Sequence, residues 1–76
     1  MENRNVKGWK FEFIDDQGDC KYFQCRGMVM YDEEHDEMPE PSLWLAAVEL
    51  MNQLIKEGIE AEAEFSEKGW VEVTIE

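Results

Sequence analysis

Apolar and polar residues alternate along the first part of this chain in the pattern of two β-strands. One run covers residues 7–14, where aromatic side chains occupy every second position, and another covers residues 20–31. Successive side chains of a strand point to opposite faces, so each run predicts a strand buried on one side. The Asp-Asp-Gln-Gly-Asp cluster between them is typical of a turn. We therefore expect an antiparallel hairpin over residues 7–31, with a bulge or bend at Gly27.

The middle of the chain has the periodicity of an amphipathic helix over residues 42–57. Gly58 follows it, and glycine commonly ends helices. Residues 32–41 before the helix are acidic and contain two prolines, which predicts a loop with Glu40 or Ser42 as the N-cap. The apolar positions form two adjacent stripes, which are Leu43, Ala47, Leu50 and Leu54, and Trp44, Val48, Met51 and Ile55. Such a wide apolar arc suits a helix that lies across a sheet.

Strict alternation returns in residues 59–76, where two runs flank a Glu-Lys-Gly turn. They predict a second hairpin that is apolar on one face and acidic on the other. The expected fold class is therefore α+β with the order ββαββ, in which a single helix covers one face of a four-stranded antiparallel sheet. We expect one domain over residues 1–76, because a chain of this length has room for one modest core.

The composition favours a folded, cytoplasmic protein. Four Phe, three Trp and two Tyr argue against disorder in spite of the high charge. No stretch is long and apolar enough for a membrane span, and residues 1–5 lack the apolar segment of a signal peptide. Cys20 and Cys25 are expected to be free thiols, because residues five apart on one strand point to opposite faces.

The net charge of −12 is unevenly distributed. Residues 1–30 carry five acids and five bases, and residues 41–56 carry one of each. Residues 31–40 carry six acids and no Lys or Arg, while residues 57–76 carry seven acids against Lys68. The excess negative charge therefore lies in the loop before the helix and in the last hairpin. Such a field repels nucleic acid and anionic membranes and attracts basic surfaces.

A row of glutamates is expected on one face of the last hairpin. Glu60, Glu62 and Glu64 lie two residues apart, so their side chains should emerge about 6.5–7 Å from one another. Glu72 and Glu76 should join them from the neighbouring strand. Carboxylates this close repel one another and weaken the sheet. The row is either an ordinary solvated face or a mimic of the phosphates of a nucleic-acid strand, which basic channels bind.

The candidate partner-binding surface combines both acidic segments with two aromatic anchors. For Trp44, a place in the core is the favoured alternative, because it lies within the apolar arc of the helix. The candidates are Glu60, Glu62, Glu64, Glu72, Glu76, Asp32, Glu33, Glu34, Asp36, Glu37, Trp44 and Trp70.

The sequence predicts no enzyme, no cofactor and no dedicated metal site. The acids lie on faces expected to be exposed, where little would separate their pKa values for acid–base catalysis. The acidic loop around His35 lacks the spacing of a calcium-binding EF-hand loop, and the two cysteines lack zinc-site spacing. An acidic surround would raise, not lower, the pKa of Cys20 or Cys25. Direct nucleic-acid binding is excluded because the five bases of residues 1–30 are spread through a neutral hairpin.

In size, acidity and ββαββ pattern, the chain resembles small phage-encoded inhibitors of host defence, including anti-CRISPR and anti-restriction proteins. The resemblance covers the overall character of the chain and carries no motif onto particular residues. It implies an inhibitor that mimics nucleic acid and occludes a basic site on a host-defence complex. A protein-interaction module or homodimer without mimicry is the alternative, followed by a small metal-binding domain. The oligomeric state stays open.

Overall fold

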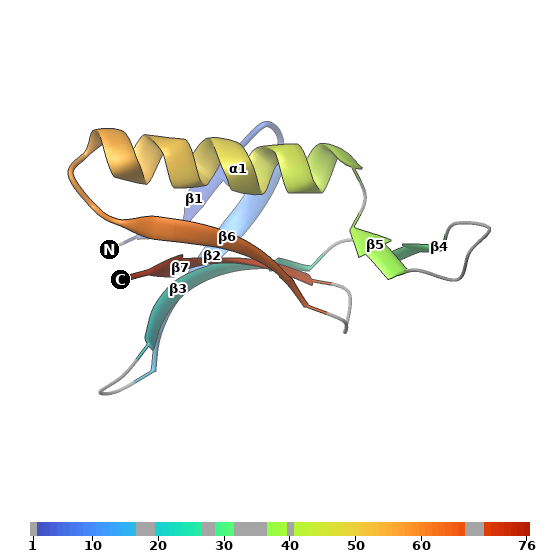
Figure 1. Ribbon diagram of the computed structural model, residues 1–76, viewed down its shortest axis with the longest axis horizontal. Coiled ribbons are helices and arrows are strands. Elements are labelled where there is room, and N and C mark those ends of the chain that lie inside the picture. The colour runs from blue at the N-terminus through green and yellow to red at the C-terminus, as the bar shows by residue number, and fades with distance from the viewer. Residues whose placement is uncertain (1, 17–19, 27–28, 32–36, 40, 67–69) are drawn as a thin grey trace.

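One helix and seven strands make up the parts of the chain that the computed structural model describes, which are residues 2–16, 20–26, 29–31, 37–39, 41–66 and 70–76 (Figure 1). In chain order the elements are β1 (Arg4–Val6), β2 (Trp9–Asp16), β3 (Cys20–Arg26), β4 (Val29–Tyr31), β5 (Glu37–Pro39), α1 (Pro41–Lys56), β6 (Ala61–Ser66) and β7 (Trp70–Ile75). The α+β class expected from the sequence is confirmed.

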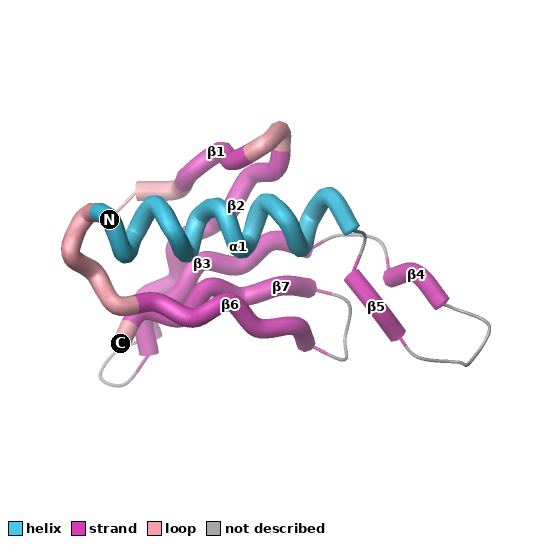
Figure 2. Tube along the Cα trace, turned by 45° about the horizontal axis from the view of Figure 1, so that its top comes forward, coloured by secondary structure: helices cyan, strands magenta, loops and turns pink. Residues whose placement is uncertain are grey.

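The main sheet has five strands in the order β1-β2-β3-β7-β6, and every neighbouring pair is antiparallel. The last hairpin joins the first through β7, which therefore lies between β3 and β6. Helix α1 lies along one face of this sheet (Figures 1 and 2). The expected count of four strands is wrong, because β1 adds a fifth strand at the edge beside β2.

The additional strand depends on a two-residue turn that the alternation conceals. Lys7 and Gly8 both have positive φ, 51° and 86°, and they connect Val6 to Trp9, which pair across the turn. Positive φ at both central residues is the hairpin geometry that Asn-Gly and Asp-Gly usually adopt. Because lysine occupies the first of these positions, the sequence lacks the Asn-Gly or Asp-Gly pair that would predict the turn. As a result β2 begins at Trp9, and not at residue 7 as the sequence predicts.

The expected long strand over residues 20–31 is also wrong, because it is divided between two sheets. β3 ends at Arg26, and β4 pairs with β5 in a separate two-stranded sheet in which Val29 lies opposite Pro39. The expected acidic loop therefore contains a short strand, Glu37–Pro39. Proline is tolerated in a two-stranded ribbon because each strand has one side free of ladder hydrogen bonds. Figure 1 shows this ribbon beyond the first turn of α1.

Helix α1 begins one residue earlier than predicted, with Pro41 at its first position, where a missing N–H costs no helical bond. Ser42 lies inside the helix, and its Oγ accepts a hydrogen bond from Trp9 Nε1 at 3.3 Å. It is therefore not the N-cap, and Glu40 lies outside the described residues. None of the described segments forms a helix with the length and apolarity needed to cross a membrane.

The helix ends in a Schellman motif. The N–H of Ile59 donates to the carbonyl of Leu54 at 2.9 Å, and the N–H of Gly58 donates to the carbonyl of Ile55 at 3.0 Å. Gly58 has φ of 86°, as the motif requires. Ile59 also packs against the core that contains Leu54, so the motif fixes both the end of α1 and the entry into β6.

The core lies between α1 and the sheet, and it contains the first of the two apolar stripes predicted for the helix. Leu43, Ala47, Leu50 and Leu54, the first predicted stripe of the helix, are fully buried. Each large apolar side chain removed from water contributes about 1.5–3 kcal/mol. The largest fully buried side chains are Phe11, Phe23, Leu43, Leu50, Leu54, Val71 and Val73. β2, β3 and β7 supply most of the sheet side of this core, with Val6 from β1 and Ala61 from β6, and this fixes the face that α1 covers.

We expect Gly58→Ala to destabilise the fold through backbone strain alone. An added Cβ would meet nothing within 4 Å, but an L-residue at φ 86° is strained. The free energy of unfolding should fall by about 1–2 kcal/mol in urea denaturation. Gly58→Asn should cost less, because Asn tolerates the left-handed region. Equal stability of the Ala variant and the parent would contradict this account of the helix end.

Candidate acidic binding face

The main sheet has one face under the helix and one face that no described element covers. β7 shows the division most clearly, because Val71 and Val73 are buried in the core while Glu72 and Thr74, at the alternate positions, point away from it. The register of the ladders extends the division across the sheet. Gln24 lies opposite Glu72, and Glu64 lies opposite Glu72 on the other side. We call the uncovered side of the sheet the open face.

The five glutamates predicted for the last hairpin share the open face. Glu60, Glu62, Glu64 and Glu76 are exposed, and Glu72 is half-buried. Glu64 and Glu72 are direct cross-strand partners. The N–H of Glu76 donates to the carbonyl of Glu60 at 3.0 Å, so these two residues are also opposite each other, just before β6 and after β7. The structure therefore brings together every predicted acid of this hairpin.

In the free protein, carboxylates in directly opposite positions repel each other and destabilise this part of the sheet. Side chains of cross-strand partners lie about 4.5–5.5 Å apart at Cβ, and like charges there destabilise a sheet. Between the two acidic pairs, Glu62 lies opposite Thr74, which is neutral. The hairpin thus concentrates negative charge at the edge of the sheet formed by β6 and β7. A basic partner surface would relieve this repulsion.

We call Glu60, Glu62, Glu64, Glu72 and Glu76 the acidic row. An aromatic side chain lies at one end of this row, and a base lies beside it. Trp70 is half-buried, and its Nε1 donates to Oε1 of Glu72 at 2.7 Å. Cζ of Arg26, on β3, lies 5.4 Å from the centroid of the Trp70 ring, in cation–π contact. The sequence predicts Arg26 as one of five bases spread through a neutral first hairpin. Only the pairing of β3 with β7, which sets Arg26 opposite Trp70, brings the base to this face.

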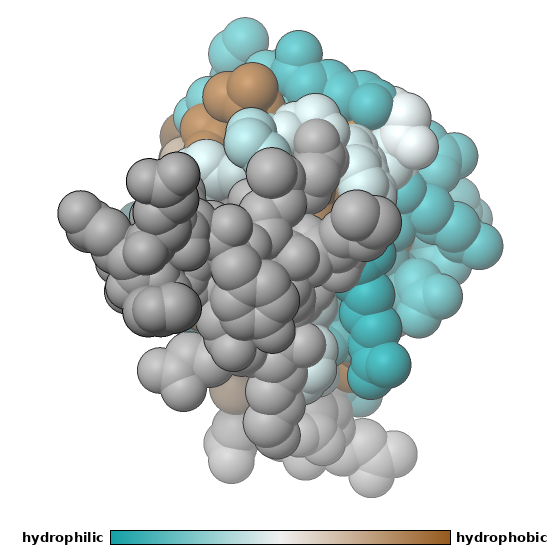
Figure 3. All heavy atoms as spheres, turned by 90° about the vertical axis from the view of Figure 1, so that its right-hand side faces the viewer, coloured by the Kyte–Doolittle hydropathy of each residue, from teal (hydrophilic) through white to brown (hydrophobic). Residues whose placement is uncertain are grey.

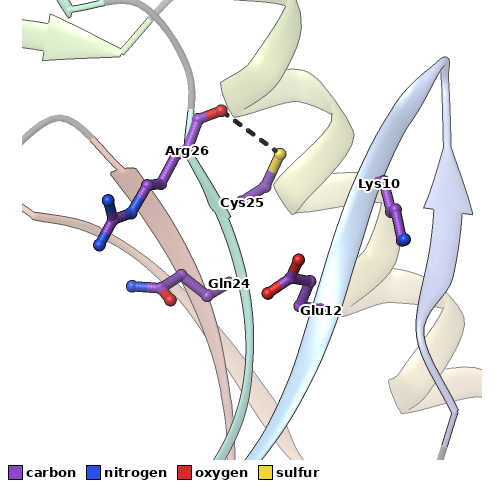
Figure 4. Close-up of a pocket in the computed structure, with 5 residues that line it drawn as sticks. All are labelled: Lys10, Glu12, Gln24, Cys25 and Arg26. Atoms are coloured by element: carbon purple, nitrogen blue, oxygen red, sulfur yellow. Dashed lines mark hydrogen bonds between the residues drawn. The ribbon is translucent and has the colours of Figure 1, made fainter.

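A pocket of about 260 Å³ lies on the β2–β3 part of the sheet and is lined by Lys10, Glu12, Gln24, Cys25 and Arg26. In Figure 4 the Lys10 and Arg26 side chains diverge, and those of Glu12 and Gln24 lie between them. Two bases thus flank one carboxylate and one amide along its wall. No pattern in the sequence indicates this pocket, because its residues come together through the β2–β3 register.

The two cysteines lie on opposite faces of β3, as predicted. Cys20 is exposed and Cys25 is buried, and both are free thiols. Burial, with a smaller contribution from the negative charge of Glu12, raises the pKa of the Cys25 thiol. The predicted direction is confirmed, although burial is the larger cause. A thiol with a raised pKa is a poor nucleophile at neutral pH. The Sγ–H group also donates a weak hydrogen bond to the Arg26 carbonyl, at 3.9 Å.

The remaining predicted site residues are not brought into the acidic row by the described structure. Asp32, Glu33, Glu34 and Asp36 lie outside the described residues, and only the backbone of Glu37 is described, in β5. Trp44 is half-buried and packs against the core, which was the favoured alternative to an anchor role. Within the described ranges, no three His, Cys, Asp or Glu side chains are grouped as metal ligands would be.

One acid of the C-terminal segment is neutralised by a distant base. The guanidinium of Arg4, on β1, makes two hydrogen bonds to the carboxylate of Glu57, at 2.6 and 2.8 Å. Cζ of Arg4 also lies 5.8 Å from the centroid of the Phe23 ring. The hydrogen bonds from Arg4 lower the pKa of Glu57. This ion pair connects the short edge strand to the end of the helix, and it neutralises one of the seven acids of residues 57–76.

We expect this ion pair to make stability depend on pH in the acid range. Glu57 has a lower pKa in the folded than in the unfolded chain, so its contribution is complete above the ordinary value of 4.5. The contribution is lost as the pH falls through the lower folded value. The Tm difference between the parent and Glu57→Gln should thus be largest near pH 7 and shrink as the pH falls below 4.5. Glu2→Gln, a matched loss of one exposed charge, should show no such trend; equal trends would contradict the assignment.

The candidate site thus consists of five glutamates on the open face of the last hairpin, with Trp70 and Arg26 beside them. It lies along one edge of the sheet, and the uncovered face gives a partner access to the carboxylates. Comparison with protein-family models, curated proteins and solved structures found no match to this chain.

Proposed function

We propose that this protein binds a basic partner protein through the acidic row and occludes a nucleic-acid-binding site on it. The observation that carries the proposal is the common placement of Glu60, Glu62, Glu64, Glu72 and Glu76 on one accessible face. Carboxylates spaced about 6.5–7 Å along β6 have a spacing similar to that of phosphates along a nucleic-acid strand. A partner that binds phosphates would meet a comparable row of negative charge.

In the proposed mechanism, charge increases the rate of association and an apolar contact decreases the rate of release. The net charge of −12 attracts a basic surface over distances near the Debye length and speeds association. Trp70 then supplies the apolar contact area that slows release, since tryptophan is enriched among the residues that carry most binding energy. Glu72 and Arg26 hold its ring in place at the end of the row. Occlusion needs no chemistry and no cofactor.

The acidic row can be tested by charge reversal against a matched control. Proteins that bind the immobilised chain are isolated from an extract of its source organism and identified by mass spectrometry. The Kd of this protein for the captured partner is then measured by competition with DNA. Glu62→Lys with Glu64→Lys should weaken binding by at least roughly tenfold, because attraction becomes repulsion. Glu2→Lys with Asp15→Lys makes the same change in net charge at exposed positions outside the last hairpin. This control variant should weaken binding less.

Salt provides the second criterion for the acidic row. The affinity of the parent chain should fall steeply between low and physiological salt, because the proposed contacts are between exposed charges. An affinity that changes neither with salt nor with the Glu62 and Glu64 substitutions would overturn the proposal. So would a captured partner whose nucleic-acid binding is unaffected by this protein.

A second candidate function follows from the outer side of the helix. Leu45 and Ile55 are 60% and 51% exposed, and half-buried Val48 lies between them on the same side. Figure 3 shows hydrophobic atoms at the surface near the top of the molecule, where the helix lies. An exposed apolar stripe is typical of a helix that docks onto another surface. This observation favours an interaction module or homodimer that does not mimic nucleic acid.

Sedimentation velocity at low and high salt separates the two functions. We expect a monomer at both salt concentrations, because the negative charge of two copies opposes association and Leu45 and Ile55 offer little apolar area. A dimer that persists at high salt would instead support the module. In that case Leu45→Gln with Ile55→Gln should dissociate it, while Glu62→Lys with Glu64→Lys should not.

A further inference from the structure

Strand β6 is an edge strand whose free side can be identified residue by residue. In the sheet order it pairs with β7 alone. The N–H of Glu76 donates to the carbonyl of Glu60, so this pair is a hydrogen-bonded pair of the antiparallel ladder. Such pairs recur at every second residue, so Glu62 and Glu64 also direct their backbone groups toward β7. Ala61, Ala63 and Phe65 therefore direct their N–H and C=O groups away from β7, to the free edge.

The free edge is more accessible toward the C-terminal half of β6. Ala61 is 8% exposed, whereas Ala63 and Phe65 are half-buried. Among the described elements in Figures 1 and 2, no strand lies beyond β6. Its sequence, Ala-Glu-Ala-Glu-Phe-Ser, contains neither the lysines nor the prolines that commonly protect sheet edges from pairing. The backbone groups of Ala63 and Phe65 are thus available to another extended segment.

We propose that β6 accepts an extended basic segment of the partner protein as an additional antiparallel strand, with Lys or Arg opposite Glu62 and Glu64. The register of β6 favours this arrangement. Residues opposite Ala63 and Phe65 would form hydrogen-bonded pairs, so those opposite Glu62 and Glu64 would form non-hydrogen-bonded pairs. These have the closest side chains, with Cα atoms about 4.5 Å apart. Alternating bases would therefore meet the glutamates where contact is strongest. This inference rests on the proposed function and names its partner segment.

The same register disfavours a second copy of this chain as the occupant. If two β6 strands paired about Ala63, Glu62 of one copy would lie opposite Glu64 of the other. Pairing about Glu62 or Glu64 would place that residue opposite itself. Each arrangement sets like charges in the closest class of cross-strand pair, which is destabilising. The glutamates therefore protect the edge from self-association and leave it open to a basic strand.

The inference can be tested with a seven-residue capped peptide that alternates threonine and lysine. Its Kd for this protein is measured at low salt by fluorescence anisotropy. N-methylation of the threonines removes the N–H groups that would bond to Ala63 and Phe65, so binding should weaken about tenfold. N-methylation of the lysines removes N–H groups that point away from β6. That peptide is the matched control and should bind nearly as well as the parent peptide.

A change in the protein gives the complementary test. Ala63→Pro removes an N–H that points to the free edge and leaves the β6–β7 ladder intact, so the fold should persist while peptide binding weakens about tenfold. Glu64→Pro removes an N–H that bonds to β7 and should lower Tm more. Should Ala63→Pro fail to fold, the methylated peptides still decide the question.

The outcomes distinguish this inference from the proposed function. Equal affinity of the two methylated peptides, or a dimer formed through β6, would overturn strand addition. Loss of binding in Glu62→Gln with Glu64→Gln, together with equal binding of the methylated peptides, would leave the acidic row as the binding surface. A peptide affinity that is the same at low and high salt and in the Glu62 and Glu64 variants would contradict the proposed function itself.

Discussion

Strand β7 sets the constraint on which the rest of the structure depends, because it lies inside the sheet with a strand on each side. Its pleat sends Val71 and Val73 into the core beneath the helix and Trp70, Glu72 and Thr74 to the open face. The two sets cannot be exchanged without a shift of register that would expose the valines. Hydrophobic burial on one side therefore fixes the position of the acidic row on the other. The core thus holds the acidic row in place, although the glutamates contribute nothing to the core.

The parts of the fold that the sequence predicted are those with strong periodicity. The helix was placed within one residue at each end, because its apolar arc and Gly58 agree. The alternation of Glu60, Glu62 and Glu64 with small apolar residues identified both the last hairpin and its charged face. These features depend on neighbours in the sequence, and local geometry is enough to derive them.

The features that escaped prediction depend on unusual turns or on long-range pairing. The Lys7–Gly8 turn adopts a conformation more typical of Asn-Gly, so β1 was not recognised as a strand. The division between β3 and β4 follows from the pairing of β4 with β5 instead of the main sheet. The cation–π contact of Arg26 with Trp70 and the ion pair of Arg4 with Glu57 join residues 44 and 53 positions apart. No local pattern encodes such contacts.

The opposed carboxylates of Glu64 and Glu72 have a consequence for how salt acts on this molecule. Dissolved ions screen the repulsion within the free chain, so moderate salt should make the folded hairpin more stable. The same ions would compete with the proposed basic partner for the same carboxylates. The stability of the free protein and the affinity of the proposed complex should therefore respond to ionic strength with opposite signs. Moderate ionic strength would keep the unbound protein folded and would leave the proposed complex reversible.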